Sequence, residues 1–286
     1  KMLRSYYDAR LYLQDTNLTT ISSNEQPDLI VVKCEKLEVV GGKFGPSTHK
    51  VVLNKTIFHP QGGGQPSDVG VIELQTASSK RSRFQVFIVL NSPDSTIEHF
   101  GYNLPNESED DVLFTDLASG DLSPFMISLT VDADKRRRHS HLHSVGHMLD
   151  GAMRTIGYDS NKFKPAKGYH FNDGPYVEYE IIDANLMKEI SANKESDKFF
   201  DEIVQQLQQH LELLVSQKID TIVSYSLGNG ENGSEQLIRV VNVAGCECPC
   251  GGTHIGNTQE ITERIVVTKI KRKKSILKVS YDLETV

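Results

Sequence analysis

The segment at residues 248–261, CPCGGTHIGNTQEI, is the feature that most restricts how this chain can fold. It places Cys250 and His254 four positions apart, on either side of a Gly-Gly-Thr turn. A zinc site needs three or four nitrogen, sulfur or oxygen ligands, and this turn supplies at most two of them. The other ligands must come from elsewhere, so the fold has to bring two remote segments together.

A histidine-rich segment at residues 136–153, RRRHSHLHSVGHMLDGAM, can complete such a site. It places His139, His143 and His147 at four-residue intervals. Side chains four apart lie on one face of a helix, about 6 Å apart between Cβ atoms, so two of them can chelate one ion. The overlapping pairs are His139/His143 and His143/His147. We prefer the second pair, because HSVGHML enters the apolar part of the helix whereas His139 adjoins the arginine run.

The spacing disfavours two other kinds of zinc protein. A zincin peptidase requires HExxH with the glutamate as general base, and here Ser144 follows His143. A small structural finger keeps its two ligand pairs close together, whereas more than one hundred residues separate these pairs. A zinc held across a whole domain is typical of a functional cleft.

Cysteine usage and charge indicate the class of protein. Three of the four cysteines, Cys246, Cys248 and Cys250, lie in one short segment, unlike the dispersed framework of a secreted disulfide scaffold. We therefore expect a reducing, cytoplasmic location, and no membrane partner, because no stretch approaches the roughly 18 apolar residues of a span. The net charge of −7 argues against indiscriminate coating of nucleic acid, although basic runs at 135–138 and 264–278 flank the candidate site.

The hydrophobic pattern predicts two domains. Short β-like runs such as GVIELQT and RFQVFIVLN, separated by turn residues, favour an antiparallel barrel or sandwich between residues 29 and 120. An acidic, turn-rich segment at 101–123 is the expected boundary. Beyond it we expect helices at 134–156 and 197–218, with strands after each. The predicted fold class is α+β, with a β-barrel-like domain over 1–123 and an α+β domain that carries the zinc site over 124–286.

Three motifs together resemble the editing domain of alanyl-tRNA synthetase and its free-standing relatives, the AlaX trans-editing proteins. They are FHPQGGGQPSDVG at 58–70, HSVGH on the predicted helix, and CGGTH about a hundred residues later. They occur in the family's order and cover about 56–260, which is most of the chain. No ATP-binding aminoacylation domain accompanies them. We therefore expect the free-standing form, of the larger type with a glycine-motif barrel in front.

The resemblance implies a zinc site and a tRNA-binding surface. The implied Zn²⁺ ligands are His143, His147, Cys250 and His254. Residues expected to receive the acceptor end of tRNA, or to contact it from the basic runs, are Thr56, Gln61, Gly62, Gly63, Gly64, Gln65, Arg138, Lys271 and Arg272. Thr253 and His139 are polar groups close to the ligands in sequence and are the catalytic candidates, although neither is assigned as a general base.

The sequence also departs from the family pattern. His59 stands where the family usually has tyrosine, and Val145 and Gly146 are variants that affect the floor of the pocket. Cys246 and Cys248 have no assigned role. Cys248 lies two residues from Cys250 and is the alternative ligand.

The implied reaction is hydrolysis of the ester that joins serine or glycine to mischarged tRNA(Ala). A synthetase pocket shaped for alanine cannot strongly exclude the smaller glycine, nor a side chain that merely adds a hydroxyl, so a second site removes the products. Zinc in such a site activates water, polarises the ester carbonyl or orients the substrate. Two alternatives stay open: a zinc-stabilised RNA-binding protein without catalysis, and a zinc hydrolase that acts on small esters or amides.

Overall fold

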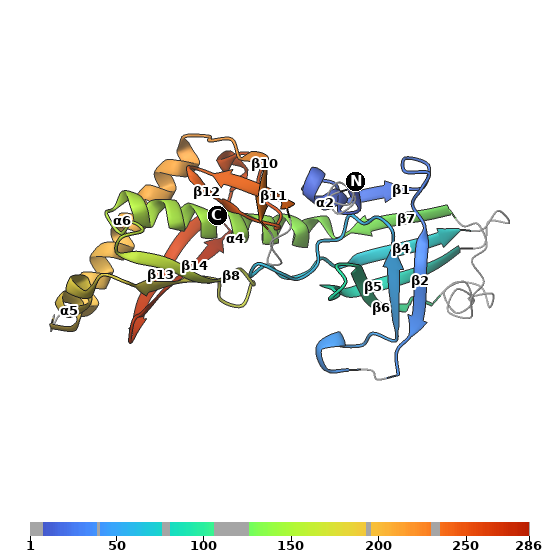
Figure 1. Ribbon diagram of the computed structural model, residues 1–286, viewed down its shortest axis with the longest axis horizontal. Coiled ribbons are helices and arrows are strands. Elements are labelled where there is room, and N and C mark those ends of the chain that lie inside the picture. Colours follow the sequence, from blue (N-terminus) through green and yellow to red (C-terminus); the bar gives the residue numbers. More distant parts are fainter. Residues whose placement is uncertain are drawn as a thin grey trace. The chain divides into compact units, whose positions relative to one another are not determined.

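The computed structural model describes residues 8–38, 41–75, 81–105, 126–192, 196–229 and 235–285 (Figure 1). The chain divides into two compact units, one made of Lys1–Gly62 and Pro66–Arg137, the other of Gly63–Gln65 and Arg138–Val286. The predicted domain boundary after residue 123 falls within 106–125, outside the described residues, and stays a prediction.

The first unit is built on one antiparallel sheet with the order β1-β7-β4-β5-β6-β3-β2. Register shifts at Val31/Lys33 and Val86/Ile88 mark bulges, which bend a sheet, and the described strands form a curled half-barrel. The strands are β1 (Thr20–Ser22), β2 (Val31–Lys36), β3 (His49–Leu53), β4 (Gly70–Gln75), β5 (Arg81–Asn91), β6 (Ile97–Asn103) and β7 (Met126–Val131), with the short helices α2 (Leu11–Gln14) and η1 (Gly42–Phe44).

Alternation along the strands turns one face of this sheet toward the core of the first unit. In β4, the residues Gly70, Ile72 and Leu74 are buried while their neighbours are partly exposed, as a period of two requires.

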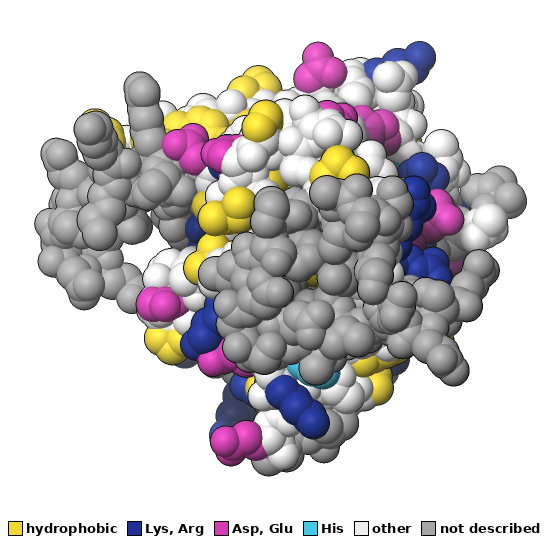
Figure 2. Space-filling model, turned by 90° about the vertical axis from the view of Figure 1, so that its right-hand side faces the viewer, with side chains coloured by type: hydrophobic (Ala, Val, Ile, Leu, Met, Phe, Trp, Pro, Cys, Tyr) yellow, Lys and Arg dark blue, Asp and Glu magenta, His cyan; other side chains and the backbone are white. Residues whose placement is uncertain are grey.

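On the face of the molecule in Figure 2, basic side chains in dark blue and acidic ones in magenta are interspersed among the described residues. The described part of that face therefore shows no large field of one sign.

A buried ion pair ties the loop after the glycine motif to the start of helix α4 (Ala133–Thr155) within the first unit. Arg136 Nε donates to both carboxylate oxygens of Asp68, at 2.9 and 3.0 Å, and its Nη2 donates to the carbonyl of Ile57 at 2.6 Å. The Asp68 carboxylate also accepts the backbone N–H of His59 at 2.5 Å. The side chains of Arg136 and Asp68 are 3% and 0% exposed, so each charge depends on the other.

The second unit contains two sheets and most of the helical structure. A four-stranded sheet has the order β13-β14-β9-β8, and a three-stranded sheet has the order β10-β11-β12. Its elements besides α4 are β8 (Phe163–Tyr169), β9 (Tyr176–Ile181), α5 (Ala184–Ala192), α6 (Ser196–Ser216), β10 (Ile222–Asn229), β11 (Glu235–Val243), β12 (Cys246–Pro249), η2 (Thr258–Glu260), β13 (Arg264–Lys273) and β14 (Ile276–Glu284). The chain is thus mixed α and β, and the helices predicted at 134–156 and 197–218 are confirmed to within two residues.

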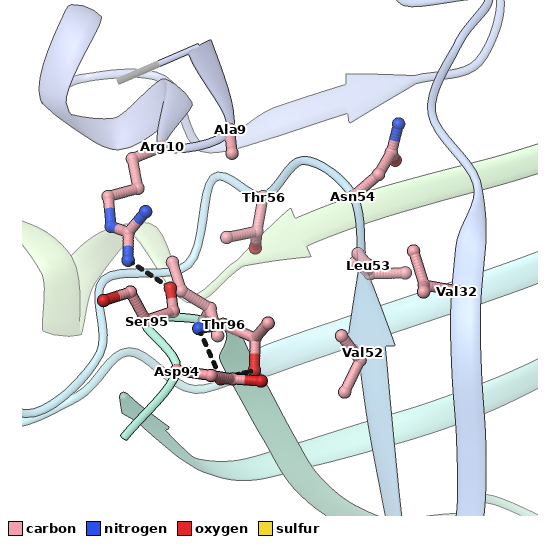
Figure 3. A pocket seen from close by; sticks show the side chains of 11 residues that line it. Ala9, Arg10, Val32, Val52, Leu53, Asn54, Thr56, Asp94, Ser95 and Thr96 are labelled. Atoms are coloured by element: carbon pink, nitrogen blue, oxygen red, sulfur yellow. Dashed lines mark hydrogen bonds between the residues drawn. The ribbon is translucent and has the colours of Figure 1, made fainter. Parts of the chain in front are cut away.

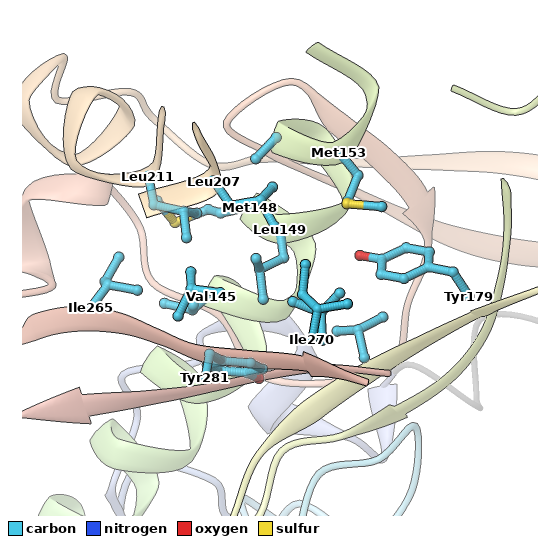
Figure 4. Packing of buried hydrophobic residues seen from close by; sticks show 14 of the residues in the cluster. Val145, Met148, Leu149, Met153, Tyr179, Leu207, Leu211, Ile265, Ile270 and Tyr281 are labelled. Carbon is cyan, nitrogen blue, oxygen red and sulfur yellow. The ribbon is translucent and has the colours of Figure 1, made fainter. Parts of the chain in front are cut away.

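Helix α4 lies in the core of the second unit, packed with α6 and the four-stranded sheet (Figure 4). Val145, Leu149 and Met153 recur at intervals of four, so they share one helix face, and Leu207 and Leu211 of α6 do the same. This apolar packing holds the histidine face of α4 in a fixed direction. Among the described residues, no helix combines the length and apolar character needed to cross a membrane.

The Arg136–Asp68 pair gives a stability prediction. Substituting Arg136→Met leaves the Asp68 carboxylate buried without its cation, and we expect the free energy of unfolding to fall by about 3–5 kcal/mol. Arg137→Met is the matched control, because the Arg137 side chain is 67% exposed and lies 3.8 Å from Asp134. That variant should change stability by about 0.5 kcal/mol or less. Urea denaturation of both variants measures the difference, and equal midpoints would contradict the assignment.

Candidate metal centre

Helix α4 presents His143 and His147 side by side. Both imidazoles are buried, and their ring centroids lie 5.0 Å apart. The His254 ring lies 4.5 Å from that of His143 and 4.8 Å from that of His147. The thiol of Cys250 lies 3.5 Å from His143 Nε2 and 3.3 Å from His254 Nε2. Ligand atoms of these four residues all lie within 4.8 Å of one another.

The turn between Cys250 and His254 approaches α4 closely because Gly252 has no side chain. A Cβ at Gly252 would lie 2.1 Å from Cε1 of His143, which no side chain could tolerate. The buried Arg239 of β11 holds the turn, because its Nη1 donates to the carbonyls of Cys250 at 2.7 Å and of Gly252 at 3.1 Å. The second glycine of CGGTH is therefore a packing requirement.

The carboxamide of Gln65 fixes the tautomer of His143. The backbone N–H of Thr253 donates to Gln65 Oε1 at 3.0 Å, which identifies that atom as the oxygen. His143 Nδ1 lies 2.7 Å from the same oxygen and must therefore carry the proton. The Nε2 of a neutral His143 is then left with its lone pair, on the side of Cys250. Gln65 is fully buried, so this contact is shielded from water.

The two ring nitrogens of His147 have different surroundings. Its Nδ1 lies 3.2 Å from the sulfur of Cys248, while its buried Nε2 has no hydrogen-bond partner within the described residues. Burial lowers the pKa of His147, but the thiols of Cys246 and Cys250 outweigh that effect and raise the pKa to about 10. Burial raises the pKa of Cys250, and His147 nevertheless holds it below its ordinary value. His147 and Cys250 thus each shift the pKa of the other toward its charged form.

These features fit a metal ion. A buried imidazole nitrogen without a partner and a thiol with a lowered pKa are groups that a divalent cation would bind, releasing protons. Three imidazoles and one thiolate form a donor set compatible with zinc. The His/Cys group can therefore hold a metal, whereas the role of each residue as a ligand stays a prediction.

The other cysteines and Ser144 lie around the four residues. Cys248 contacts His147 and does not belong to the group of four, while Cys246 forms a second group with His147 and Asp150. Ser144 occupies the position of a zincin glutamate. Its buried hydroxyl accepts the backbone N–H of Ile255 at 3.1 Å and lies 3.4 Å from His254 Nδ1. Ser144 therefore connects α4 to the turn.

The two catalytic candidates differ in position. Thr253 is fully buried, its hydroxyl accepts from Gln65 Nε2 at 2.7 Å, and it lies 2.7 Å from the hydroxyl of Ser140. Both contacts are structural, so this placement favours support of the turn over contact with substrate. His139 is buried on α4, one turn before His143, and is not among the group of four.

The glycine-motif residues occupy different surroundings. Gln61 and Gly62 are exposed, and Gly63 lines the cavity beside the His/Cys cluster. Gly64 has φ 79°, and a Cβ there would lie 2.4 Å from the carbonyl oxygen of Gly168. Its own carbonyl accepts the N–H of His170 at 2.8 Å.

Thr56 belongs to the first unit. Its hydroxyl lies 2.8 Å from His99 Nε2 and accepts the backbone N–H of Phe58 at 3.0 Å. Thr56 lines a cavity of about 460 Å³ in which Arg10 Nη2 donates to the carbonyl of Ser95 at 2.7 Å (Figure 3). The buried Thr56 hydroxyl is thus already engaged by core residues.

The three basic candidates differ in whether a protein group already engages the side chain. Arg138 donates to Asp282 Oδ1 at 3.0 Å and to the carbonyl of Leu283 at 2.8 Å. Arg272 Nη1 donates to the hydroxyl of Ser191 at 3.0 Å, whereas Lys271 is exposed. Lys271 is therefore the best placed of these three cations to meet a partner.

A cavity of about 310 Å³ adjoins the cluster, lined by Gly63, His143, Gly146, His147 and Cys250 together with residues of β8 and β9. It also contains His170, which the sequence did not single out. A lone histidine after β8 carries no motif, so only the fold identifies it. Burial and the charge of His147 lower the pKa of His170 to about 3.

Comparison with known proteins agrees with the motifs. No family model matches the chain. The chain is 26% identical over 234 residues to the alanyl-tRNA editing protein AlaX-M of Methanosarcina barkeri, covering 78% of this chain and 84% of that protein. It is 23% identical over 284 residues to AlaX-L of Pyrococcus horikoshii, covering 95% and 57%, and 25% identical over 222 residues to an alanine–tRNA ligase of Halobacterium salinarum, covering 77% and 21%. The chain thus spans about half of AlaX-L and a fifth of the ligase. The predicted similarity to the alanyl-tRNA editing proteins is confirmed.

The Gln65 contact predicts a specific loss of metal affinity. Gln65→Ala removes the acceptor that fixes the His143 tautomer, and loss of such a supporting hydrogen bond typically weakens metal binding by about 10- to 100-fold. Gln61→Ala, in the same motif but exposed, should leave zinc affinity unchanged. Competition with a chromophoric zinc chelator measures both. Equal zinc affinities of Gln65→Ala and the unmodified protein would refute the assignment.

Proposed function

We propose that this chain, as an AlaX-type relative of the alanyl-tRNA editing proteins, is an aminoacyl-tRNA deacylase. It hydrolyses the ester that joins serine or glycine to mischarged tRNA(Ala) and depends on zinc. One observation carries the proposal: two pairs of candidate ligands, more than one hundred residues apart in the sequence, lie in one cluster beside a cavity. The same motifs supply the resemblance to editing proteins. A tRNA substrate implies a cytoplasmic location.

The residues of this chain would divide the work as follows. His143, His147, Cys250 and His254 would hold the ion, which when bound would polarise the ester carbonyl or activate water. Gln65 keeps the proton of His143 on Nδ1, away from the thiol. Gly252 and Arg239 bring the turn against α4. The adjoining cavity, of about 310 Å³, lies at the lower end of the range of small-molecule sites.

Exposed positive charge on the β13–β14 hairpin supports tRNA as the partner. The β13–β14 hairpin carries Lys269, Lys271 and Lys273 on β13, and all three side chains are exposed. A substrate as small as a free amino acid ester needs no such surface, whereas phosphates of an acceptor stem do. These charges favour a tRNA substrate over the small-ester hydrolase considered from the sequence.

The deacylase assignment is tested by the release of labelled serine from Ser-tRNA(Ala). We expect release that is lost after zinc is chelated and restored on its return, with correctly charged Ala-tRNA(Ala) and Thr-tRNA(Thr) spared. His147→Ala and Cys250→Ser should lower bound zinc and deacylation together, because each removes one ligand. Release from none of the three by the zinc-loaded protein would favour the non-catalytic RNA-binding alternative.

The basic hairpin gives an independent prediction about tRNA affinity. Each cation–phosphate contact contributes roughly 0.9 to the slope of log K against log salt. The combined variant Lys271→Gln, Arg272→Gln, Lys273→Gln should therefore flatten the salt dependence, mainly through the two exposed lysines. Lys36→Gln, an exposed lysine on β2 of the first unit, is the control for a change in charge alone. Binding of tRNA that is independent of salt in the unmodified protein would remove this argument.

A further inference from the structure

We infer that His170 is a substrate-contacting residue whose Nε2 accepts a hydrogen bond from the side-chain hydroxyl of the bound amino acid. This inference rests on the proposed function and names the residue that distinguishes serine from glycine. His170 is outside the three motifs. It lies directly after β8, beyond the end of α4.

The orientation of the His170 ring follows from its neighbours. Tyr281 donates its hydroxyl proton to the carbonyl of Leu142 at 2.8 Å, so toward His170 that hydroxyl can only accept. His170 Nδ1 lies 2.7 Å from the Tyr281 oxygen and is therefore the protonated nitrogen. The neutral ring keeps its lone pair on Nε2. Among the described residues, the hydrogen bonds of His170 involve Nδ1 and the backbone N–H, and none involves Nε2.

The ring is part of the cavity beside the His/Cys cluster. It stacks on His143 with centroids 4.7 Å apart and an interplanar angle of 19°. It lines the cavity with His143 and His147, and only 5% of the residue is exposed. Nε2 is not among the fully buried polar atoms that lack a partner, so it keeps access to the cavity. Nε2 is thus available to a donor that enters the cavity.

Three glycines leave room for the ring. A Cβ at Gly146 would lie 2.4 Å from His170 Cε1, and one at Gly168 would lie 2.5 Å from Nε2. A Cβ at Gly64 would lie 3.1 Å from Cδ2. Gly146 lies on α4, Gly168 lies on β8, and Gly64 belongs to the glycine motif. Gly146, one of the two positions that depart from the family pattern, therefore provides the space that His170 fills.

The surroundings of Nε2 favour a neutral donor. Lys167 also lines the cavity, Asp150 in the same lining is engaged by the hydroxyl of Tyr179 at 2.7 Å, and a metal cation in the cluster would add positive charge. An α-ammonium group placed at Nε2 would meet these cations, whereas a hydroxyl would not. Among the amino acids expected on the substrate, serine carries a side-chain hydroxyl and glycine does not. A site that hydrogen-bonds a hydroxyl discriminates strongly against an analogue that lacks it.

The test compares kcat/KM for Ser-tRNA(Ala) and Gly-tRNA(Ala) in His170→Phe, which keeps an aromatic ring but removes the acceptor. We expect a loss of about 10- to 100-fold for the seryl substrate, the usual effect of losing one buried hydrogen bond. The glycyl substrate should change by no more than about 2-fold. His170→Gln, which restores an acceptor oxygen, should recover part of the seryl activity. Zinc content and thermal midpoint, measured alongside, verify that the variants are folded and loaded.

Two results would overturn the inference. Equal losses on both substrates would mean that His170 acts on water or on the shared ester, and no loss on either would mean that it only fills space. If the unmodified protein hydrolyses neither ester, the proposed function fails by itself. The inference is then decided by affinity for the stable seryl and glycyl amides of 3′-amino-adenosine. A seryl preference that His170→Phe abolishes supports it, and equal affinities overturn it.

Substitution of Gly146 provides a second, independent test of the role of His170, with Gly151 as its control. Gly146→Ala should displace the His170 ring and reproduce the selective loss on the seryl substrate, because its Cβ would overlap Cε1. Gly151→Ala on the same helix is the matched control, since its Cβ would make only ordinary contacts at 3.6 and 3.8 Å. The same substrate ratio in both variants would contradict the role of the glycines in placing His170.

Discussion

Three imidazoles and a thiol packed into one buried cluster are the constraint on which the second unit depends. Such polar groups are costly to bury unless partners satisfy them, and three neighbours of the cluster meet part of that requirement. Gln65 fixes the proton of His143, Cys248 contacts Nδ1 of His147, and Ser144 connects His254 to α4. One donor atom from each of the four residues thereby lies within 4.8 Å of the others, an arrangement that could hold a single cation.

Glycines set how closely the segments of the cluster can approach. Gly252 lets the Cys-His turn meet His143, and Gly64 lets the glycine motif meet β8. Gly146 and Gly168 make space for an additional imidazole, His170, where side chains would otherwise stand. The glycine-rich stretches therefore act largely through packing, and the shape of the cavity follows from which glycines are present.

The sequence predicted those parts of the site that depend on local spacing. The intervals in HSVGH and CGGTH placed two candidate ligands on one helix face and two on one turn, and the helix itself was predicted within two residues. Apart from the meeting of these two motifs, contacts between segments remote in the sequence could not be predicted from it. Gln65 was expected to meet tRNA but is buried against His143, while His170, Tyr281 and Arg239 reach the site from strands or loops without any motif. The domain boundary and the ligand assignment stay predictions.

X-ray absorption at the zinc edge of the metal-loaded protein tests the central claim most directly, because it counts sulfur and nitrogen neighbours without reference to activity. The account predicts one sulfur and three nitrogens, with the sulfur contribution lost in Cys250→Ser and kept in Cys248→Ser. Two sulfurs in the unmodified protein, or a sulfur that persists in Cys250→Ser, would show that Cys246 or Cys248 is a ligand and that the set of three imidazoles and one thiolate is wrong.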